Sequence, residues 1–300
     1  MKQIAFLATA AALLTFAACN SLDPGRPDSA QPITIDAAIG VPTRATTTGD
    51  SEKFDTGDKV ALYAWLGGAT AVPEQRLVND VEHELQADGT WKPASPIYWQ
   101  DNASAHYFLG VFPARSISDF KADSFTLKAD NYVASDLLVA TELSGLIASN
   151  GPVKLNFKHM MAKFQLNLSY SNEFDAVPAG TTAAASDVAV SCAVDYLAAS
   201  VAPGTKGSVA LTKLATAAAG SAESHSALMI PQAGFRTVTL VVGGKTYVYT
   251  HPSDLTLTSG KTTVLNLLVG RDRIELGSMT IADWTSQGDP VQGEVFKPAA

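Results

Sequence analysis

Short runs of residues that alternate between apolar and polar character recur along this sequence, separated by turn residues. A period of two is typical of half-buried β-strands, whereas an amphipathic helix repeats every 3.6 residues. No long segment with the helical period stands out. The sequence therefore predicts an all-β protein, and many short strands with frequent turns indicate β-sandwiches, two of them in this chain.

The clearest pair of strands lies in the sequence FRTVTLVVGGKTYVYT, residues 235–250. Alternating apolar residues run up to Gly243-Gly244 and continue beyond it, and such a two-residue turn is a strong signal for a β-hairpin. Residues 254–270, DLTLTSGKTTVLNLLVG, have a similar pattern around a Ser-Gly turn. We expect a second hairpin there.

The run VKLNFKHMMAKFQLNLSY, residues 153–170, is too long for one flat strand. Its apolar residues change parity near Met160–Met161, which predicts a bulge or bend. Residues 171–186 are mostly small or polar and are interpreted as a linker. The expected domains are an N-terminal β-sandwich over residues 45–172 and a C-terminal β-sandwich over residues 173–300.

The N-terminus has the pattern of a bacterial export signal. Lys2 precedes an apolar run, residues 4–18, that is too short to span a membrane comfortably. The run ends in FAAC, which resembles a lipobox, with Phe16 where Leu is usual. We expect residues 1–18 to be a lipoprotein signal peptide and Cys19 to be lipidated, since several acyl chains give stable anchoring. The alternative is an ordinary secretory signal with a cysteine by chance.

A polar, proline-containing tether over residues 19–32 leads to the sequence ITIDAAIG. Its isoleucines alternate with polar or small residues, which predicts a half-buried strand; they are Ile33, Ile35 and Ile39. A loop follows, and its only arginine is Arg44, set among Thr, Pro and Gly. Arg44 is either an ordinary loop residue or a place where the chain is cut, because such segments are accessible to proteases.

Composition narrows the class of partner. The chain has 300 residues, 46% of them hydrophobic, so it can bury a sizeable core. Its net charge is −8, and no cluster of Lys or Arg offsets it, so nucleic acid is not an expected partner. The second cysteine, Cys192, shares a strand face with Val188, Val190 and Val194 and is interpreted as a buried thiol.

No motif for catalysis or for metal binding emerges, so we expect no enzyme activity, no cofactor and no metal. The stretches GGKT and GKTT lack the earlier glycine of a phosphate loop, and there is no G-x-S-x-G elbow. Asp80, Glu82 and Glu84 would share one strand face and could bind calcium, but a solvated face is the commoner explanation. His159 is interpreted as a hydrogen-bonded core histidine.

Aromatic residues raise the possibility of sugar binding. Trp91, Tyr98 and Trp99 lie close together in GTWKPASPIYWQ and could stack on a glycan. Aromatic side chains also fill the cores of β-sandwiches, and core packing is the favoured interpretation.

Several stretches resemble the fimbrillin family of Bacteroidetes, the Mfa-like subunit lipoproteins of fimbriae. The resemblance begins at the lipobox, continues through TRA at 43–45 and FDTGDKVALYAW at 54–65, and includes WKPASPIYWQDNASAHYFLGVFP at 91–113. It continues with DLLVA at 136–140 and VKLNFKHMMAKFQLNL at 153–168, and ends with IADW at Trp284. These motifs occur in the order of the family and cover most of the first 170 residues, with Gln100 where the family usually has Pro.

The resemblance implies two tandem transthyretin-like β-sandwich domains and a role in assembly. It further implies export to the outer membrane as a lipoprotein and cleavage by an arginine-specific protease in the loop after the first strand. Residues 33–44 would then be the removable strand and cleavage loop, with Arg44 before the cut and Ala45 as the new N-terminus. A strand from another fimbrial subunit would fill the vacated place, which is strand addition in a polymer.

Alternatives remain open at this stage. Arg26 is a second possible cleavage site, and Arg44 stays uncut if the chain is an anchor. The tail DPVQGEVFKPAA, residues 289–300, makes a weak donor strand, so the place in the fibre can be stalk, anchor or tip. The main rival function is a surface glycan-binding lipoprotein. A host or bacterial surface ligand is possible for either function.

Overall fold

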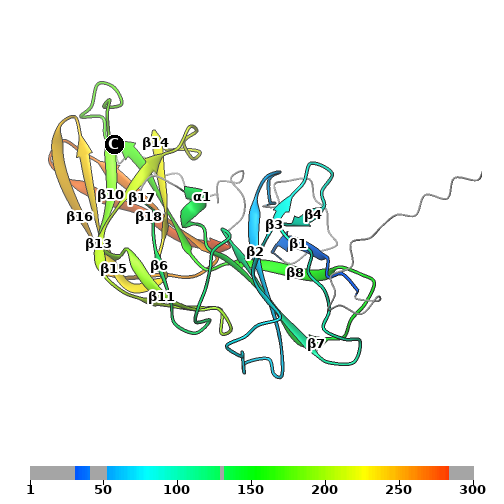
Figure 1. Cartoon of the computed structure of the whole chain (residues 1–300). Helices are drawn as coiled ribbons and strands as arrows, with labels where there is room; N and C mark the ends of the chain where they lie inside the picture. Colours follow the sequence, from blue (N-terminus) through cyan, green and yellow to red (C-terminus); the bar gives the residue numbers. More distant parts are fainter. Residues whose placement is uncertain (1–30, 41–52, 129–131, 284–300) are drawn as a thin grey trace, which may run out of the picture. The chain divides into compact units, whose positions relative to one another are not determined.

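The computed structural model describes residues 31–40, 53–128 and 132–283. Within these ranges the regular elements are β-strands apart from one four-residue helix, α1, at Tyr132–Ser135. The strands form a seven-stranded, an eight-stranded and a three-stranded sheet (Figure 1). The predicted fold class, all-β with two tandem transthyretin-like β-sandwich domains, is confirmed.

The first sandwich is built on the seven-stranded sheet, which has the order β1-β8-β7-β5-β2-β3-β4. Its strands are β1 (Ile35–Ile39), β2 (Lys59–Leu66), β3 (Val78–Leu85), β4 (Trp91–Pro93), β5 (His106–Phe112), β7 (Leu138–Leu146) and β8 (Val153–His159).

Apolar side chains cover both faces of the central strand β2. Val60 and Leu62 face one cluster, called here the first core, which also contains residues of β1, β8 and β4. Ala61 and Tyr63 face a second cluster on the opposite side of the sheet, called the middle core. Burial on both faces explains why β2 reads as a nearly continuous apolar run rather than as an alternating one.

The second sandwich is one eight-stranded sheet with the order β16-β15-β10-β13-β14-β9-β17-β18. Its strands are β9 (Ala162–Tyr170), β10 (Thr182–Ala189), β13 (Lys206–Lys213), β14 (Glu223–Met229), β15 (Gln232–Val242), β16 (Lys245–Leu257), β17 (Lys261–Val269) and β18 (Ile274–Asp283).

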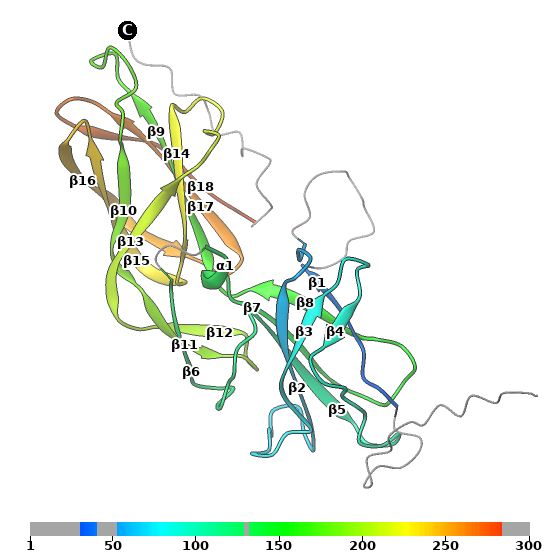
Figure 2. The ribbon, with the colours of Figure 1, turned by 45° about the horizontal axis from the view of Figure 1, so that its top comes forward.

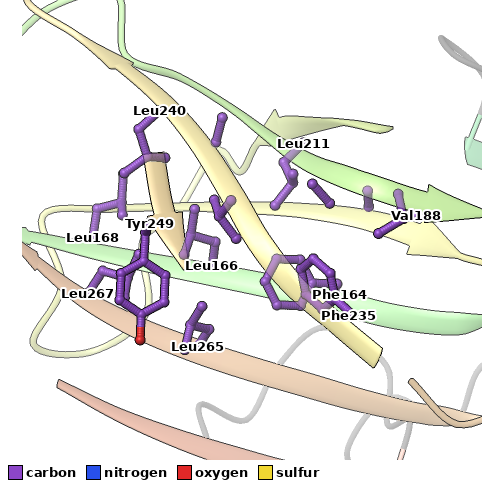
Figure 3. Packing of buried hydrophobic residues seen from close by; sticks show 14 of the residues in the cluster. Phe164, Leu166, Leu168, Val188, Leu211, Phe235, Leu240, Tyr249, Leu265 and Leu267 are labelled. Carbon is purple, nitrogen blue, oxygen red and sulfur yellow. The ribbon is translucent and has the colours of Figure 1, made fainter. Parts of the chain in front are cut away.

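The eight-stranded sheet folds over, so that its two halves face each other across one core (Figures 1 and 2). Leu166 and Leu265 come from one half, and Leu240 and Tyr249 come from the other (Figure 3). The rings of Phe164 and Phe235 meet edge to face at 5.0 Å, a favourable geometry for aromatic pairs.

The three-stranded sheet joins segments that are distant in the sequence. It consists of β6 (Asp123–Thr126), β11 (Ser191–Asp195) and β12 (Ser200–Pro203), in the order β12-β11-β6. Strands from both sides of residue 172 therefore share one sheet, and β11 contributes Cys192 and Val194 to the middle core.

Two features of the sequence were interpreted correctly. The hairpin around Gly243-Gly244 is confirmed, with φ of 57° and 79° at the two glycines. These are the positive values that a two-residue hairpin turn requires. The chain also bends at Met160–Met161, where β8 of the first sheet ends and β9 of the second begins.

Three other interpretations were wrong. Residues 254–270 form no hairpin, because β17 pairs with β9 and β18 while β16 pairs with β15 at the other edge. Residues 182–186 of the supposed linker belong to β10, whose Ala183 and Ala185 are buried in the core. The single strand through Val188 and Cys192 is two strands in different sheets, broken at Val190. The predicted burial of the Cys192 thiol is confirmed.

Candidate functional site

The strand predicted over ITIDAAIG is β1, an edge strand of the first sheet. It pairs in parallel with β8, with register from Ile35 opposite Val153 to Ile39 opposite Phe157. The pairing extends past the strand at both ends, where the amide of Val153 donates to the carbonyl of Thr34 at 2.8 Å and that of Gly40 donates to the carbonyl of Phe157 at 2.8 Å. In the order of the sheet β8 is the neighbour of β1, so β1 lies at the outer edge of the sheet.

The residues just before β1 are hydrogen-bonded to a different segment, residues 97–99. The amide of Ile33 donates to the carbonyl of Ile97 at 2.9 Å, and the amide of Trp99 donates to the carbonyl of Gln31 at 3.0 Å. Pro32 forms an antiparallel bridge with Tyr98. The segment 31–40 is therefore bonded to residues 97–99 at its start and to β8 along its length. Sequence reasoning missed the partner segment, because nothing in the local pattern reveals a pairing over more than 60 residues.

The apolar side of this segment belongs to the first core. Ile33 is 2% exposed and Ile35 is 6% exposed, and both lie in one cluster with Leu155 and Phe157 of β8. Ile39 is half-buried and packs against the same cluster. The polar residues between them, Thr34 and Asp36, are exposed, as the predicted half-buried strand requires.

An aromatic cluster forms the floor of the first core next to β8. The ring of Phe54 meets the rings of Trp91, Phe112 and Phe157 edge to face, at 5.2, 5.5 and 5.3 Å between centroids. Gly110 leaves room for this packing, because a Cβ there would lie 2.7 Å from the Cζ of Phe157. The core that β1 covers is therefore closely packed and rich in apolar surface.

The expected processing residues flank β1 in the sequence. Gly40 follows the last residue of the strand, and its φ of +76° suits glycine. Arg44 and Ala45 follow within four or five residues and lie outside the described residues, as do Cys19 and Arg26. The structure thus places Ile33, Ile35 and Ile39 but not the residues of the expected cut or the lipid.

Two of the three residues considered for glycan stacking, Trp91 and Trp99, belong to the first core. Trp91 and Trp99 are 9% and 6% exposed, so other side chains cover their rings. Trp99 meets His106 and Phe108 edge to face, at 4.8 and 5.4 Å. Tyr98 is half-buried beside Pro32. This packing is the arrangement that the core interpretation predicts.

Other polar candidates have structural partners. Lys59 contacts Glu82 at 2.7 Å and Glu84 at 3.7 Å, so the acidic side of β3 faces a cation of β2. The Nδ1 of His159 lies 2.8 Å from a carboxylate oxygen of Asp136, which confirms a hydrogen-bonded histidine. Across the described residues no three His, Cys, Asp or Glu side chains gather as a metal site would require. In the same part of the chain no helix has the length and apolar character to cross a membrane.

The edge strand β18 contrasts with β1. Leu276, Met279 and Ile281 stand opposite Leu267, Leu265 and Thr263 of β17, whose side chains are buried. The three side chains of β18 are nevertheless 38%, 39% and 51% exposed. The apolar side of β18 is only partly covered in this chain.

These features define a β-sandwich protein in which an edge strand, β1, precedes the body of the first domain. The sequence profile of the fimbrillin-like family matches residues 43–284, and the chain belongs to that family. No curated protein sequence matches the chain.

Solved structures share the fold. A candidate cell adhesion protein from Bacteroides uniformis superposes with a TM-score of 0.66 at 18% identity, covering 85% of this chain and 99% of that one. A second, from Bacteroides ovatus, has a TM-score of 0.66 at 15% identity, with 87% and 100% covered. A fimbrial protein from Bacteroides vulgatus has a TM-score of 0.50 at 12% identity, with 85% and 100% covered.

Proposed function

We propose that this protein is a subunit of type V-like fimbriae that serve adhesion, and that it assembles by losing its first strand and accepting a strand from a neighbouring subunit. The precursor is lipidated at Cys19 and carried to the outer membrane. An arginine-specific protease then cuts between Arg44 and Ala45. The observation that supports this proposal is β1 itself, an edge strand that fills the first core and stands directly before the cleavage segment.

Loss of β1 would leave unpaired backbone on two sides. The edge of β8 would lose its ladder of five residue pairs, and residues 97–99 would lose their bonds to residues 31–33. Leu155 and Phe157 would face solvent. An open apolar edge of this kind favours the addition of another strand, whose main chain restores the hydrogen bonds and whose alternate side chains fill the core.

The donor is proposed to come from the C-terminal end of a neighbouring subunit. One candidate is the tail, residues 289–300, which lies outside the described residues. The other is β18, because its apolar side is already half exposed and, among the strands that the structure describes, β17 alone pairs with it. A tip subunit would accept a strand without donating one, so structural, accessory and tip positions all fit the proposed acceptor site.

The protein does no chemistry in this proposal. Its partners are the other fimbrial subunits, the protease, the outer membrane through the lipid, and a ligand on a host or bacterial surface. Similar folds include proteins described as fimbrial or as candidate cell adhesion proteins, which supports the same role here. The second candidate function, a surface glycan-binding lipoprotein, has less support because the rings of Trp91 and Trp99 are covered.

The test is the N-terminal sequence and intact mass of the protein in native surface fractions, compared with Arg44→Ala and with Arg26→Ala as the matched control. We expect the wild type and Arg26→Ala to begin at Ala45 and to form ladders on gels without boiling. Arg44→Ala should keep a lipidated Cys19 and stay monomeric. A wild type that keeps Cys19 and remains monomeric even after limited trypsin digestion would overturn the proposal and favour an uncut anchor or a glycan-binding lipoprotein.

A further inference from the structure

The proposed function needs a cut after one arginine, while the sequence contains seven. Five of the seven lie in the part of the chain that the structure describes: Arg76, Arg115, Arg236, Arg271 and Arg273. Proteases preferentially nick exposed loops of small or polar residues, and an arginine-specific protease must also draw the side chain into its own pocket. An arginine therefore escapes cleavage where its backbone is fixed or where its side chain is held.

Three of these arginines lie in fixed backbone. Arg236 stands within β15, a strand with a neighbour on each side. Arg271 and Arg273 belong to the turn between β17 and β18, which is closed by a hydrogen bond of 2.8 Å from the amide of Gly270 to the carbonyl of Arg273. The amide of Arg271 also donates to a carboxylate oxygen of Glu173 at 2.7 Å. Strand pairing and a closed turn therefore shield these three sites.

The side chain of Arg115 is held by its neighbours. Its guanidinium group lies 3.0 Å from a carboxylate oxygen of Asp123 and donates to the carbonyl of Ser124 at 2.8 Å. The ring of Phe125 lies beside the same group, with 5.4 Å between the guanidinium carbon and the ring centroid. A protease has to break all of these contacts to take up this arginine.

Arg76 is the described arginine whose surroundings most resemble a cleavage loop. It stands near the end of the connection between β2 and β3, residues 67–77 with the sequence GGATAVPEQRL (Figures 1 and 2). The three residues directly before it are exposed. The composition of Gly, Ala, Thr and Pro is similar to that around Arg44, GVPTRATTTGD. Loop composition alone therefore favours a cut after Arg76 as much as a cut after Arg44.

The guanidinium group of Arg76 is nevertheless enclosed. Its Nη1 donates to the carbonyl of Ile117 and to Oδ1 of Asn79, both at 2.8 Å, and its Nη2 donates to the carbonyl of Ser118 at 2.6 Å. The ring centroid of Phe120 lies 4.0 Å from the guanidinium carbon, which is the geometry of a cation–π contact. These four residues, Asn79, Ile117, Ser118 and Phe120, are called here the arginine clamp.

The clamp is fixed to the middle core. Ile117 and Phe120 are 1% and 3% exposed and belong to that cluster. The hydroxyl of Tyr63 in β2 accepts a hydrogen bond from the amide of Ile117 at 2.9 Å and donates one to the carbonyl of Arg115 at 2.6 Å. Hydrogen bonds to a charged group in such a setting are stronger than exposed ion pairs. The loop therefore presents Arg76 to a protease only if the clamp opens.

We propose that Arg76 is a latent cleavage site that the arginine clamp masks, so that the processing protease is left with Arg44. This inference rests on the proposed cleavage after Arg44. Hydrolysis after Arg76 would break its bond to the nitrogen of Leu77, with water supplying a hydroxyl group to the carbonyl carbon and a hydrogen to the nitrogen. Such a cut would separate β2 from β3 in the domain that must accept the donor strand. The clamp thus preserves the acceptor domain while the first strand is released.

The test compares digestion of the whole chain and of its variants by a purified arginine-specific endoprotease, with each fragment identified by mass and N-terminal sequence. Phe120→Leu removes the ring next to the guanidinium group, and Asn79→Ala removes one acceptor at an exposed position. Each variant should release a fragment that begins at Leu77 about tenfold faster than the wild type, the ratio expected for the loss of one cation–π contact or one charged hydrogen bond. The matched control is Phe125→Leu, the same exchange in the same core but outside the clamp, which should leave the rate after Arg76 unchanged.

Two further controls identify the cut. A synthetic peptide of residues 67–80 lacks most of the clamp and should be cut readily after Arg76. Adding Arg76→Lys to Phe120→Leu should abolish the fragment that begins at Leu77, because the protease does not accept lysine. Both controls leave the rest of the chain as it is.

The outcomes separate the two proposals. A wild type cut after Arg76 as fast as the peptide contradicts the masking, and so does a peptide that resists the protease, because the sequence itself is then the obstacle. Equal rates in Phe125→Leu and Phe120→Leu contradict it as well, since general loosening of the core explains such a cut. Unchanged rates in both clamp variants overturn the inference and leave the cut after Arg44 untouched. A wild type that resists after both Arg44 and Arg76, with cleavage only in the clamp variants, keeps the clamp and refutes the proposed processing.

Discussion

Replacing Ile35 by Ala should destabilise the first sandwich by about 2–4 kcal/mol. The side chain of Ile35 is 6% exposed and lies in one cluster with Leu155 and Phe157, so the substitution removes buried methyl groups and leaves a cavity. Collapse of neighbouring groups into that cavity is limited, because the aromatic cluster beneath it is packed edge to face on several sides. A loss of this size is a large part of the free energy of unfolding of an ordinary domain, which is about 5–15 kcal/mol.

The assay is urea unfolding, followed by a signal from the first sandwich such as tryptophan fluorescence, since Trp65, Trp91 and Trp99 lie in that domain. With a slope of about 2–3 kcal/mol per molar urea, the midpoint of that transition should fall by about 1 M. The matched control is Thr34→Ala, one residue away on the exposed side of the same segment. Its midpoint should move by less than about 0.2 M.

The reasoning is refuted if Ile35→Ala and Thr34→Ala shift the midpoint equally, because the first strand would then contribute no apolar packing. It is also refuted if the midpoint of the second sandwich moves as far as that of the first, because Ile35 contacts only the first core. A cleaved chain offers a further check. The fragment that carries Ile35→Ala should leave the body of the domain faster than the wild-type fragment, by about tenfold for each 1.4 kcal/mol lost.

Three further predictions concern other parts of the described structure. Gly110→Ala should cost about 1–3 kcal/mol because its Cβ would lie 2.7 Å from the ring of Phe157, whereas Gly151→Ala, with open space around it, should be nearly neutral; thermal unfolding compares the two. Burial lowers the pKa of His225 below its ordinary 6.5, so the unfolded chain binds the proton more tightly. Stability of the second sandwich should therefore be complete above about pH 6.5 and fall as the pH decreases, with a smaller fall in His225→Phe, measured as urea midpoints between about pH 5 and 8. Burial raises the pKa of Cys192 to about 11, so iodoacetamide at pH 8 should label it only in denaturant; rapid labelling of the folded chain would contradict this.

The sequence predicts elements better than it predicts their partners. The alternation in ITIDAAIG is a local property, and the buried isoleucines and exposed polar residues of β1 follow it. The hairpin at Gly243-Gly244 is also local, because two glycines with positive φ join adjacent strands. The Ser-Gly turn near residue 259 looked similar, yet it connects the two halves of the folded sheet instead of neighbouring strands. Both turns contain a glycine with positive φ, but only the Gly243-Gly244 turn has two such residues in a row, as a two-residue hairpin turn requires.

The candidate site shows the same limit. Its acceptor edge, β8, lies more than 100 residues beyond β1, and the second partner, residues 97–99, has little strand pattern of its own. The alanines of β10 read as a linker because small residues have low strand propensity. Ala183 and Ala185 are nevertheless buried in the core of the second sandwich. Pairing between strands that lie far apart in the sequence depends on how the whole core packs. The local pattern of apolar and polar residues does not contain that information.

In the proposed assembly, the connection over residues 41–52 of the sequence decides whether β1 stays in place. Burial of Ile33 and Ile35 stabilises the bound strand by about 3–6 kcal/mol. Ordering its backbone opposes that gain by about 1–2 kcal/mol for each residue. In the uncut chain a short connection keeps the strand at an effective concentration in the millimolar range, which is enough for it to remain bound. A cut at Arg44 removes that advantage and turns the strand into a separate ligand. In the proposed assembly the strand then leaves, and a longer donor strand that fills more of the first core takes its place.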